Sequence, residues 1–486
     1  MKRNFVIAAL FALSFVVPNA SFGQYAEQAL QLSNLSYGGT ARFTGMGGAF
    51  GAIGGDFTTL SINPAGIGVY KNSEFSFTPL VYNTRSFSQY FDNHQQEFTT
   101  RININNAGFI FAANTNGDLK AIQFGLGYNR LANFNNSIYF EGFNNNTSFV
   151  GSLAPIANQA YKNNDYNINY PFYVDELAGA VNLLYQNSNK EWIADKYDNV
   201  SQSVWLRQEG GIDEMVFTFG GNYTDKLYFG MTMGIPIMTY RHTYQYDEWD
   251  LYDTRVPFKS MRYEEIYESN ASGINGKFGM IFKPISFLRI GAAIHTPTYY
   301  WLIQESEWMT MSSAFKDSTQ WNRTMSTPER QFEYSQTTPM RLIGSLAFVA
   351  GQIAIISADY EWVDHSMNTL RPSRENAMSE SNREIRDFYK SQHIVRAGAE
   401  FRLSNFYLRG GYGWYSSPFQ DEKLNDMSLN TWSLGAGFRA GAFGLDFAYQ
   451  NARSKSKYYP YAADPSPFAN MTNNANSYIM TLSYRY

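Results

Sequence analysis

Cysteine is absent from this chain of 486 residues. A secreted fold held together by disulfides is therefore excluded. Charge of either sign is sparse, at 16% of residues, and the formal net charge of −4 argues against nucleic acid as a partner. The one long apolar run, from Phe5 to Val17, is shorter than the ~20 residues that a membrane-spanning helix needs, so no helical span is expected.

The apolar run belongs to an N-terminal pattern typical of a secretory signal peptide. Lys2 and Arg3 precede it, and Ser21-Phe22-Gly23 places small residues at the two positions that a signal peptidase reads. We predict a signal peptide over residues 1–23, so that the mature chain begins at Gln24.

Aromatic residues are abundant, at 17%, although the mean hydropathy is −0.37. A soluble periplasmic protein or an outer-membrane β-barrel could combine these values. Alternation favours the barrel, because Tyr478, Leu482 and Tyr484 share one face of the last strand and Thr481 and Arg485 the other. The same period of two recurs over residues 287–296, 341–348, 355–362 and 406–414.

Short and long connections alternate along the chain. An all-β fold of about 14 antiparallel strands follows, a transmembrane β-barrel over residues 73–486 whose first strand is Glu74–Tyr82. A soluble propeller is the alternative, but no repeat of about 40–50 residues is visible. We expect short turns at 113–117, 223–226, 283–286, 350–352, 403–406 and 440–442, and long loops at 84–98, 131–213, 248–261, 303–333, 365–390, 416–428 and 453–474.

A glycine-rich, apolar segment from Phe43 to Tyr70 precedes the first strand. Glycine lets a backbone turn tightly and approach a wall closely, so we predict a plug, or hatch, inside the barrel over residues 24–72. A phosphate-binding loop is the alternative, but the final glycine of GxGxxG is missing and no GxxxxGK[ST] is present. The apolar residues expected to contact a ligand there are Phe43, Met46, Phe50, Ile53, Phe57 and Leu60.

The same segment carries a family resemblance. A Gly/Ala-rich stretch with Asp56, followed by Asn63-Pro64-Ala65-Gly66 just before the first strand, resembles the hatch of the FadL/TodX family of outer-membrane transporters. Residues 289–300, 337–348, 358–365 and 394–419 fit the family's later strands, and the Tyr- and Asn-rich loops resemble its Bacteroidota branch.

The resemblance implies a transport function. A hydrophobic small molecule, such as a long-chain fatty acid or an aromatic hydrocarbon, would be captured by the outer loops, enter an apolar pocket in the lumen and leave laterally when the hatch shifts. The kinked third strand, with Gly125 and Gly127, is then the expected lateral gate. The resemblance implies the outer membrane of a Gram-negative bacterium, contact with its lipids, and no cofactor or metal.

The long stretch 131–213 contains two helical patterns. In the second, Asp175 is expected to cap a helix whose stripe includes Leu177, Val181 and Leu184. An external capture groove lined by Leu153, Ile156, Leu177, Val181 and Leu184 is one interpretation, and a loop helix packing on its neighbours is the other.

Charged residues recur on the faces expected to point into the lumen. Buried charges must pair, so we expect mutual ion pairs. Alternatively, one unpaired arginine receives a carboxylate headgroup, with Arg289 and Arg341 as first candidates. The set comprises Arg289, Arg341, Arg396, Arg402, Arg409 and Arg439 with Asp359, Glu361, Glu400 and Asp446.

Two other function classes stay open at this point. None of the five histidines stands in a catalytic spacing, so we expect no enzyme and no catalytic residue. A closed barrel acting as a scaffold for secretion or surface attachment would share the fold. The chain ends on the aromatic Tyr486, a closing feature that barrel-assembly machinery recognises, and we expect a monomer.

Overall fold

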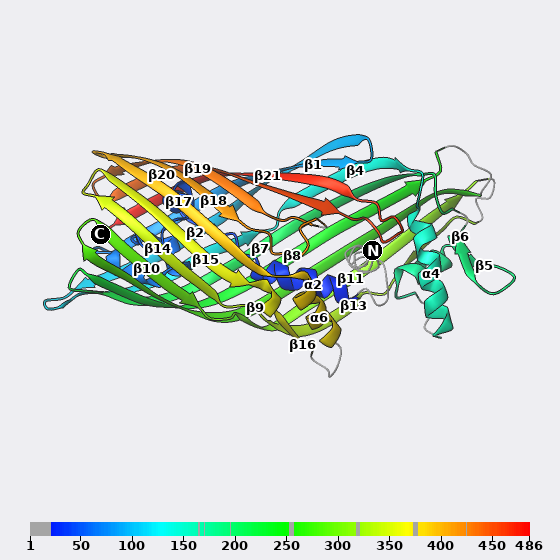
Figure 1. Ribbon diagram of the computed structural model, residues 1–486, viewed down its shortest axis with the longest axis horizontal. Helices are drawn as coiled ribbons and strands as arrows, with labels where there is room; N and C mark the ends of the chain where they lie inside the picture. Colours follow the sequence, from blue (N-terminus) through cyan, green and yellow to red (C-terminus); the bar gives the residue numbers. More distant parts are fainter. Residues whose placement is uncertain are drawn as a thin grey trace.

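The molecule is a long barrel of antiparallel strands, seen side-on in Figure 1. Fourteen strands close the wall, as the sequence predicts. Among the residues that the structure describes, no helix is long and apolar enough to cross a membrane. This computed structural model describes residues 21–163, 166–169, 171–194, 196–251, 257–316, 321–372, 378–423 and 425–486, with side chains from residue 25 onward.

Several wall strands are interrupted, so that two consecutive elements share one position in the barrel. In wall order the elements are β1 (Glu74–Tyr90), β2 (Asn93–Asn114), β3 (Leu119–Asn133) with β4 (Asn136–Asn144), β7 (Val200–Tyr223), β8 (Leu227–Trp249), β9 (Phe258–Ile285), β10 (Leu288–His295) with β11 (Tyr299–Phe315), β13 (Arg330–Thr337) with β14 (Arg341–Ala350), β15 (Ala354–Asp364) with β16 (Thr369–Pro372), β17 (Ser391–Leu403), β18 (Phe406–Tyr415), β19 (Leu429–Ala440), β20 (Phe443–Tyr458) and β21 (Ala469–Arg485).

The first and last strands close the wall. β1 pairs with β21 from Glu74 opposite Arg485 to Tyr90 opposite Ala469. Apolar side chains cover the outside of the wall, and most of the opposite side chains of the strands are buried or partly buried. Exposed outward residues include Phe109, Phe217, Phe278, Leu346, Leu408, Phe447 and Leu482.

The two ends of the barrel differ. Figure 1 shows the chain's C-terminus and the short turns at the left, which we call the turn end, and the helical loops at the right, the loop end. The described short turns fall where the sequence predicts them, except that residues 283–285 of the turn expected at 283–286 still belong to β9, which ends at Ile285.

The strands extend further toward the loop end than predicted. β1 continues to Tyr90, so the expected loop 84–98 is mostly a hairpin around Phe91. Thr84, Ser86 and Ser88 are buried there, although all are polar. Buried and exposed side chains therefore do alternate along this part of β1, but the buried side chains are polar. The expected loops 131–213, 248–261, 303–333 and 453–474 lose residues to strands in the same way.

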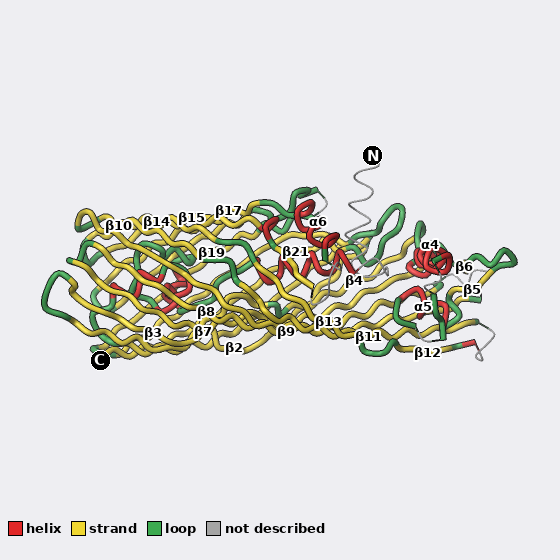
Figure 2. Tube along the Cα trace, turned by 90° about the horizontal axis from the view of Figure 1, so that it is seen from below, coloured by secondary structure: helices red, strands yellow, loops and turns green. Residues whose placement is uncertain are grey.

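The chain before β1 lies within the barrel. Its elements are α2 (Ser21–Ser33), α3 (Ala41–Gly45) and two short 3-10 helices, η1 (Phe57–Ser61) and η2 (Pro64–Val69). Figure 2 shows helical segments enclosed by strands on both sides. Residues 1–20 of the expected signal peptide lie outside the described residues. Helix α2 begins at Ser21, before the expected end of the signal peptide at residue 23.

The loops carry the remaining elements: α4 (Phe149–Lys162), α5 (Val174–Ala180), β5 (Leu184–Gln186), β6 (Trp192–Ala194), β12 (Arg323–Ser326), η4 (His365–Met367) and α6 (Ser379–Phe388). The expected helices near 131–213 exist, but the cap of the second was wrong. Tyr173, not Asp175, is the N-cap of α5. Because α5 ends at Ala180, Val181 and Leu184 do not continue its stripe, and Leu184 belongs to β5.

Candidate functional site

The hatch fills the lumen with apolar side chains. Phe43, Met46, Phe50 and Ile53 are at most 2% exposed and pack against wall residues such as Ile343. Phe57 and Leu60 form a second cluster with Ile110 and Val216 on the wall. The predicted contact residues therefore close the lumen instead of lining an open one. That they contact a ligand stays a prediction.

The hatch backbone turns at glycines whose φ angles other residues rarely adopt. Gly47 has φ +63° and Gly54 has φ +68°. A Cβ atom on Gly47 would also lie 2.8 Å from the backbone nitrogen of Tyr412 in β18. The glycine-rich composition thus serves both the turns and the close approach to the wall.

Two polar residues of the hatch motif begin its short helices. The Asp56 carboxylate accepts hydrogen bonds from the Thr58 backbone N–H (3.0 Å) and the Thr40 hydroxyl (2.6 Å), which caps η1. Asn63 accepts from the Ala65 backbone N–H and caps η2, with Pro64 at the first helical position. Gly66 lies against Gly54, where a Cβ would clash. These residues therefore stabilise the folded conformation of the hatch.

Wall side chains fix the hatch from several directions. Arg42 of α3 pairs with Glu400 of β17, with 3.0 Å between Nε and Oε2. The Asp359 carboxylate accepts the backbone N–H groups of Phe50 and Gly51, each at 2.9 Å. On the other side, Ser61 donates to Glu214, and the imidazole of His295 contacts the Ile62 carbonyl oxygen at 2.7 Å. The hatch from Thr40 to Val69 is therefore a fixed plug.

The wall itself is discontinuous at the third strand. β2 pairs with β3 only from Asn106 opposite Asn129 to the turn end, so the outer half of β2 has no ladder with the third strand. The third strand then breaks between β3 and β4. In the pairing of β1 with β2, a register shift at Thr78/Pro79 leaves Asn105 without an opposite residue. The outer half of β2 and the third strand thus border a gap in the hydrogen-bonded wall.

Residues 36–39 of the chain lie on the inner side of this gap. The N–H groups of Ser36 and Gly38 donate to the carbonyl oxygens of Leu131 and Arg130 in β3, at 3.0 and 2.9 Å. The Asn105 side chain donates to the Gly39 carbonyl oxygen at 2.6 Å. We call residues 36–39 the gap segment. It joins both borders of the gap.

The glycines expected at the lateral gate lie beside the gap, toward the turn end. Gly125 and Gly127 belong to the part of β3 that still pairs with β2. A Cβ on Gly127 would lie 2.6 Å from the Phe57 ring, and a Cβ on Gly125 would crowd Leu60 and Ile67. These glycines make room for the hatch, and the break lies nearer Arg130. Their role in a gate stays a prediction.

A small cavity in the lumen lies between the wall and residues 32–37, which include the first part of the gap segment. Its lining is largely polar and includes Glu214, Lys277, His295, Arg341 and Tyr37. Lys277 is paired with Glu214. Within the described residues, the Tyr37 hydroxyl has no hydrogen-bond partner.

Most of the expected luminal charges pair. Glu361 binds both Arg341 and Arg396, and Arg341 also donates to the Ser33 carbonyl oxygen. Glu400 and Asp446 bind the remaining arginines near the turn end, namely Arg402, Arg409 and Arg439. Arg289 differs, because it donates to the Ile53 carbonyl oxygen at 2.6 Å and has no ion pair with a carboxylate among the described residues.

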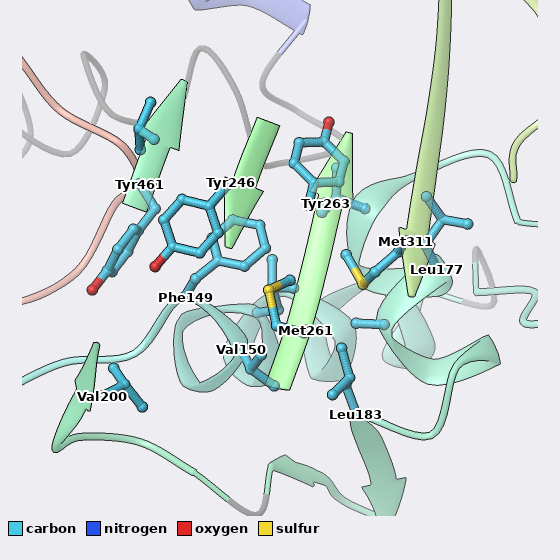
Figure 3. Packing of buried hydrophobic residues seen from close by; sticks show 14 of the residues in the cluster. Phe149, Val150, Leu177, Leu183, Val200, Tyr246, Met261, Tyr263, Met311 and Tyr461 are labelled. Carbon is cyan, nitrogen blue, oxygen red and sulfur yellow. The ribbon is translucent and has the colours of Figure 1, made fainter. Parts of the chain in front are cut away.

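The residues proposed for an outer groove lie in a packed cluster at the loop end, part of which Figure 3 shows. Leu153, Leu177, Val181 and Leu184 are at most 1% exposed, and Ile156 packs against the cluster. Aromatic side chains from the strands complete it, including Tyr246 and Tyr263. The structure matches the packing interpretation, and a ligand groove formed by these residues stays a prediction.

Sequence reasoning missed the helix in the outer lumen. α2 packs on α6 and against strand tyrosines, and the hydroxyl of Tyr389 donates to the Ala26 carbonyl oxygen at 2.9 Å. Gln28 lies between the hydroxyls of Tyr267 and Tyr334. The apolar residues Ala26, Ala29 and Leu30 of α2 are spaced as in a helix, but the pattern adjoins the expected signal peptide.

Solved structures with a similar fold are known. The toluene transporter TodX of Pseudomonas putida superposes with a TM-score of 0.53 at 12% identity, covering 93% of this chain and 99% of that chain. A Pseudomonas aeruginosa FadL homologue gives 0.53 at 10% identity, with 92% and 98% covered. This chain has a FadL/TodX-like fold. No protein-family sequence profile matches it, and no curated protein sequence does.

The FadL/TodX-like fold extends over nearly the whole chain. A TodX variant described as a deltaS2 mutant of a monoaromatic hydrocarbon channel superposes with a TM-score of 0.56 at 12% identity, covering 92% of this chain and 98% of that one.

Proposed function

We propose that this protein is an outer-membrane transporter that takes up small hydrophobic molecules and releases them sideways through the gap at the third strand. The observation that carries the proposal is the placement of the gap segment, which joins Asn105 on β2 to Arg130 and Leu131 on β3. The solved structures of similar fold are described as toluene transporters, monoaromatic hydrocarbon channels and a FadL homologue.

The outer surface supports a membrane location. Apolar side chains cover the outside of the wall, whereas the residues facing the lumen include many polar and charged ones. A closed antiparallel barrel is one of the two structures that can span a bilayer. We assign the turn end to the periplasm and the loop end to the cell exterior, because short turns and long loops divide in this way in bacterial barrels.

The fixed hatch supports a sideways exit. Wall groups bind it on several sides, so a straight path to the turn end would require several buried hydrogen bonds and an ion pair to break together. Leaving a buried polar group without its partner costs about 1–3 kcal/mol each. The gap segment has fewer bonds to break, since two backbone bonds and the Asn105 side chain hold it at the borders of the gap.

The chemistry of the lumen gives no support to catalysis. No group of three or more metal-ligating side chains comes together in the described part of the chain. The buried Ser33 and His365 are in contact at 2.9 Å, but both lie in the packed core around α2. We therefore assign the lumen to binding and passage.

Uptake into intact cells tests the proposal. Cells that contain the full-length protein and cells that lack it are given radiolabelled toluene and a radiolabelled long-chain fatty acid at concentrations below saturation. The expected result is a several-fold faster initial uptake of at least one of the two. Equal rates for both, with the barrel present in the outer membrane, would favour a non-transporting scaffold.

A further inference from the structure

Five arginines gather at the turn end of the lumen, on the side of the hatch away from α2. They are contributed by the hatch and by the turn-end parts of β10, β17, β18 and β19. We call them the arginine cluster: Arg42, Arg289, Arg402, Arg409 and Arg439.

A single aromatic ring lies at the centre of three of them. The guanidinium carbons of Arg402, Arg409 and Arg439 lie 6.0, 5.5 and 5.4 Å from the centroid of the Tyr407 ring. The face of an aromatic ring attracts cations, so Tyr407 offsets part of their mutual repulsion.

Carboxylates do not balance the cluster. Glu400 and Asp446 make its ion pairs, and Asp56 of the hatch acts on Arg42 from nearby. Five positive groups therefore face three negative ones. At the same end of the barrel, Arg485 is matched by its own partner, Glu74.

Arg289 is the member of the arginine cluster whose positive charge is least balanced by carboxylates. It bonds the Ile53 carbonyl oxygen, its Nε has no hydrogen-bond partner among the described residues, and the positive charges of Arg42 and Arg402 act on it. Within the same part of the chain, Nη2 of Arg409 also has none, although Arg409 is only 4% exposed. Guanidinium groups with free N–H donors match carboxylate and phosphate oxygens.

Solvent reaches the cluster from the turn end. The side chains of Arg402 and Arg439 are 27% and 18% exposed, whereas the hatch closes the opposite side. The cluster is thus open to small solutes and recessed within the barrel mouth.

We propose that the arginine cluster binds a small anion, through a carboxylate or phosphate group, on the periplasmic side of the hatch. The bound anion lies between Arg289 and the arginines around Tyr407, and it offsets the excess positive charge of the cluster. This charge lies next to the hatch, where Arg289 binds the Ile53 carbonyl oxygen and Arg42 binds the Gly55 carbonyl oxygen. This site is separate from the proposed transport path, which lies on the other side of the hatch.

Titration of the purified, detergent-solubilised protein tests the site. Sodium phosphate and sodium hexanoate are added separately at constant ionic strength, with chloride as the replacement, and binding is measured by calorimetry. We expect saturable binding of at least one anion. Tighter binding of phosphate identifies a free inorganic or organic phosphate as the source, and tighter binding of hexanoate identifies the head of an amphipath.

Three variants show whether the cluster is responsible. Arg289→Gln is expected to weaken binding at least tenfold, while Arg289→Lys keeps most of it because the charge remains. Arg383→Gln, on the exposed surface of α6, is the matched control and should bind like the native protein. If Arg289→Gln does not fold, Arg439→Gln takes its place. The proposal is overturned if neither anion binds saturably, or if the folded glutamine variant binds as tightly as the native protein.

Discussion

Arg42 of the hatch and Glu400 of β17 form an ion pair inside the barrel, with 3.0 Å between Nε and Oε2 and no exposure of the glutamate side chain. Glu400 also binds Arg402 and Arg409. One buried carboxylate therefore joins the plug to the wall and holds three guanidinium groups together.

Replacing this carboxylate should loosen the plug. Glu400→Gln leaves the buried Arg42 and Arg409 short of a counter-charge, and removing one partner of a buried ion pair costs about 3–5 kcal/mol. We expect a lower unfolding temperature in detergent and increased entry of large antibiotics into cells. The control is Glu268→Gln, whose pair with Arg241 is on the outer surface and should cost at most about 1 kcal/mol. Equal losses in the two variants would contradict the account.

Asp359 provides a second test of the hatch contacts. Asp359→Ala removes the acceptor for the N–H groups of Phe50 and Gly51, and two buried donors without a partner should cost about 1–3 kcal/mol each. Asp359→Asn keeps one oxygen and should lose less. Limited proteolysis of the hatch in detergent measures the difference. An alanine variant as resistant as the native protein would show that these bonds do not hold the segment.

Two glycines with similar backbone angles separate wall contact from backbone strain. Gly47 has φ +63° and a Cβ there would press on Tyr412 and Ala397, whereas Gly351 has φ +57° in an open turn with nothing within 4 Å. Alanine at either position carries the same left-handed strain, about 1 kcal/mol. We expect Gly47→Ala to lower the unfolding temperature clearly more than Gly351→Ala. Equal shifts would mean that the hatch can move away from the wall.

The outer helix α6 should respond to pH. Burial, together with the neighbouring Glu380 and Asp387, raises the pKa of Glu384 to about 7. The protonated carboxyl is therefore favoured in the folded helix. Its contribution to stability is complete below the ordinary pKa of 4.5 and is lost as the pH rises through about 7.

Hydrogen exchange of α6 measures this dependence. The native helix should exchange faster at pH 8 than at pH 5, after correction for the intrinsic rate. Glu384→Gln should abolish the difference, whereas Glu329→Gln, in an exposed loop position, should not change it. A glutamine variant with the native pH profile would exclude Glu384 as the cause.

The sequence predicts the barrel well because each wall strand meets two environments. The alternation around Tyr478 and Thr481 places β21 correctly, and mutual ion pairs among the luminal charges follow from the cost of burying charge. Arg341, a first candidate for an unpaired arginine, nevertheless has Glu361 as its partner. The choice of Glu361 as that partner could not be predicted, since it depends on which strands lie side by side. The hairpin beyond Tyr82 was missed because its buried face, with Thr84 and Ser86, is polar.

The candidate site was predictable only in part. The hatch follows from glycines next to apolar residues, but the structure and not the sequence showed that the motif residues Asp56 and Asn63 cap its short helices. The gap at the third strand results from a register shift at Thr78/Pro79 and the end of the β2–β3 ladder, which no local pattern encodes. Sequence reasoning therefore came close to the gap at Gly127 but could not place it.

A disulfide across the gap tests the central claim most directly. The chain has no cysteine, and a Cβ on Gly38 would lie 3.0 Å from Cγ of Asn105, so Gly38→Cys with Asn105→Cys can tether the gap segment to β2. The serine double variant controls for the lost Asn105 bond. We predict that the oxidised tether reduces uptake of the transported ligand at least tenfold and that a reductant restores it. Unchanged uptake through the fully oxidised variant would contradict exit at the gap.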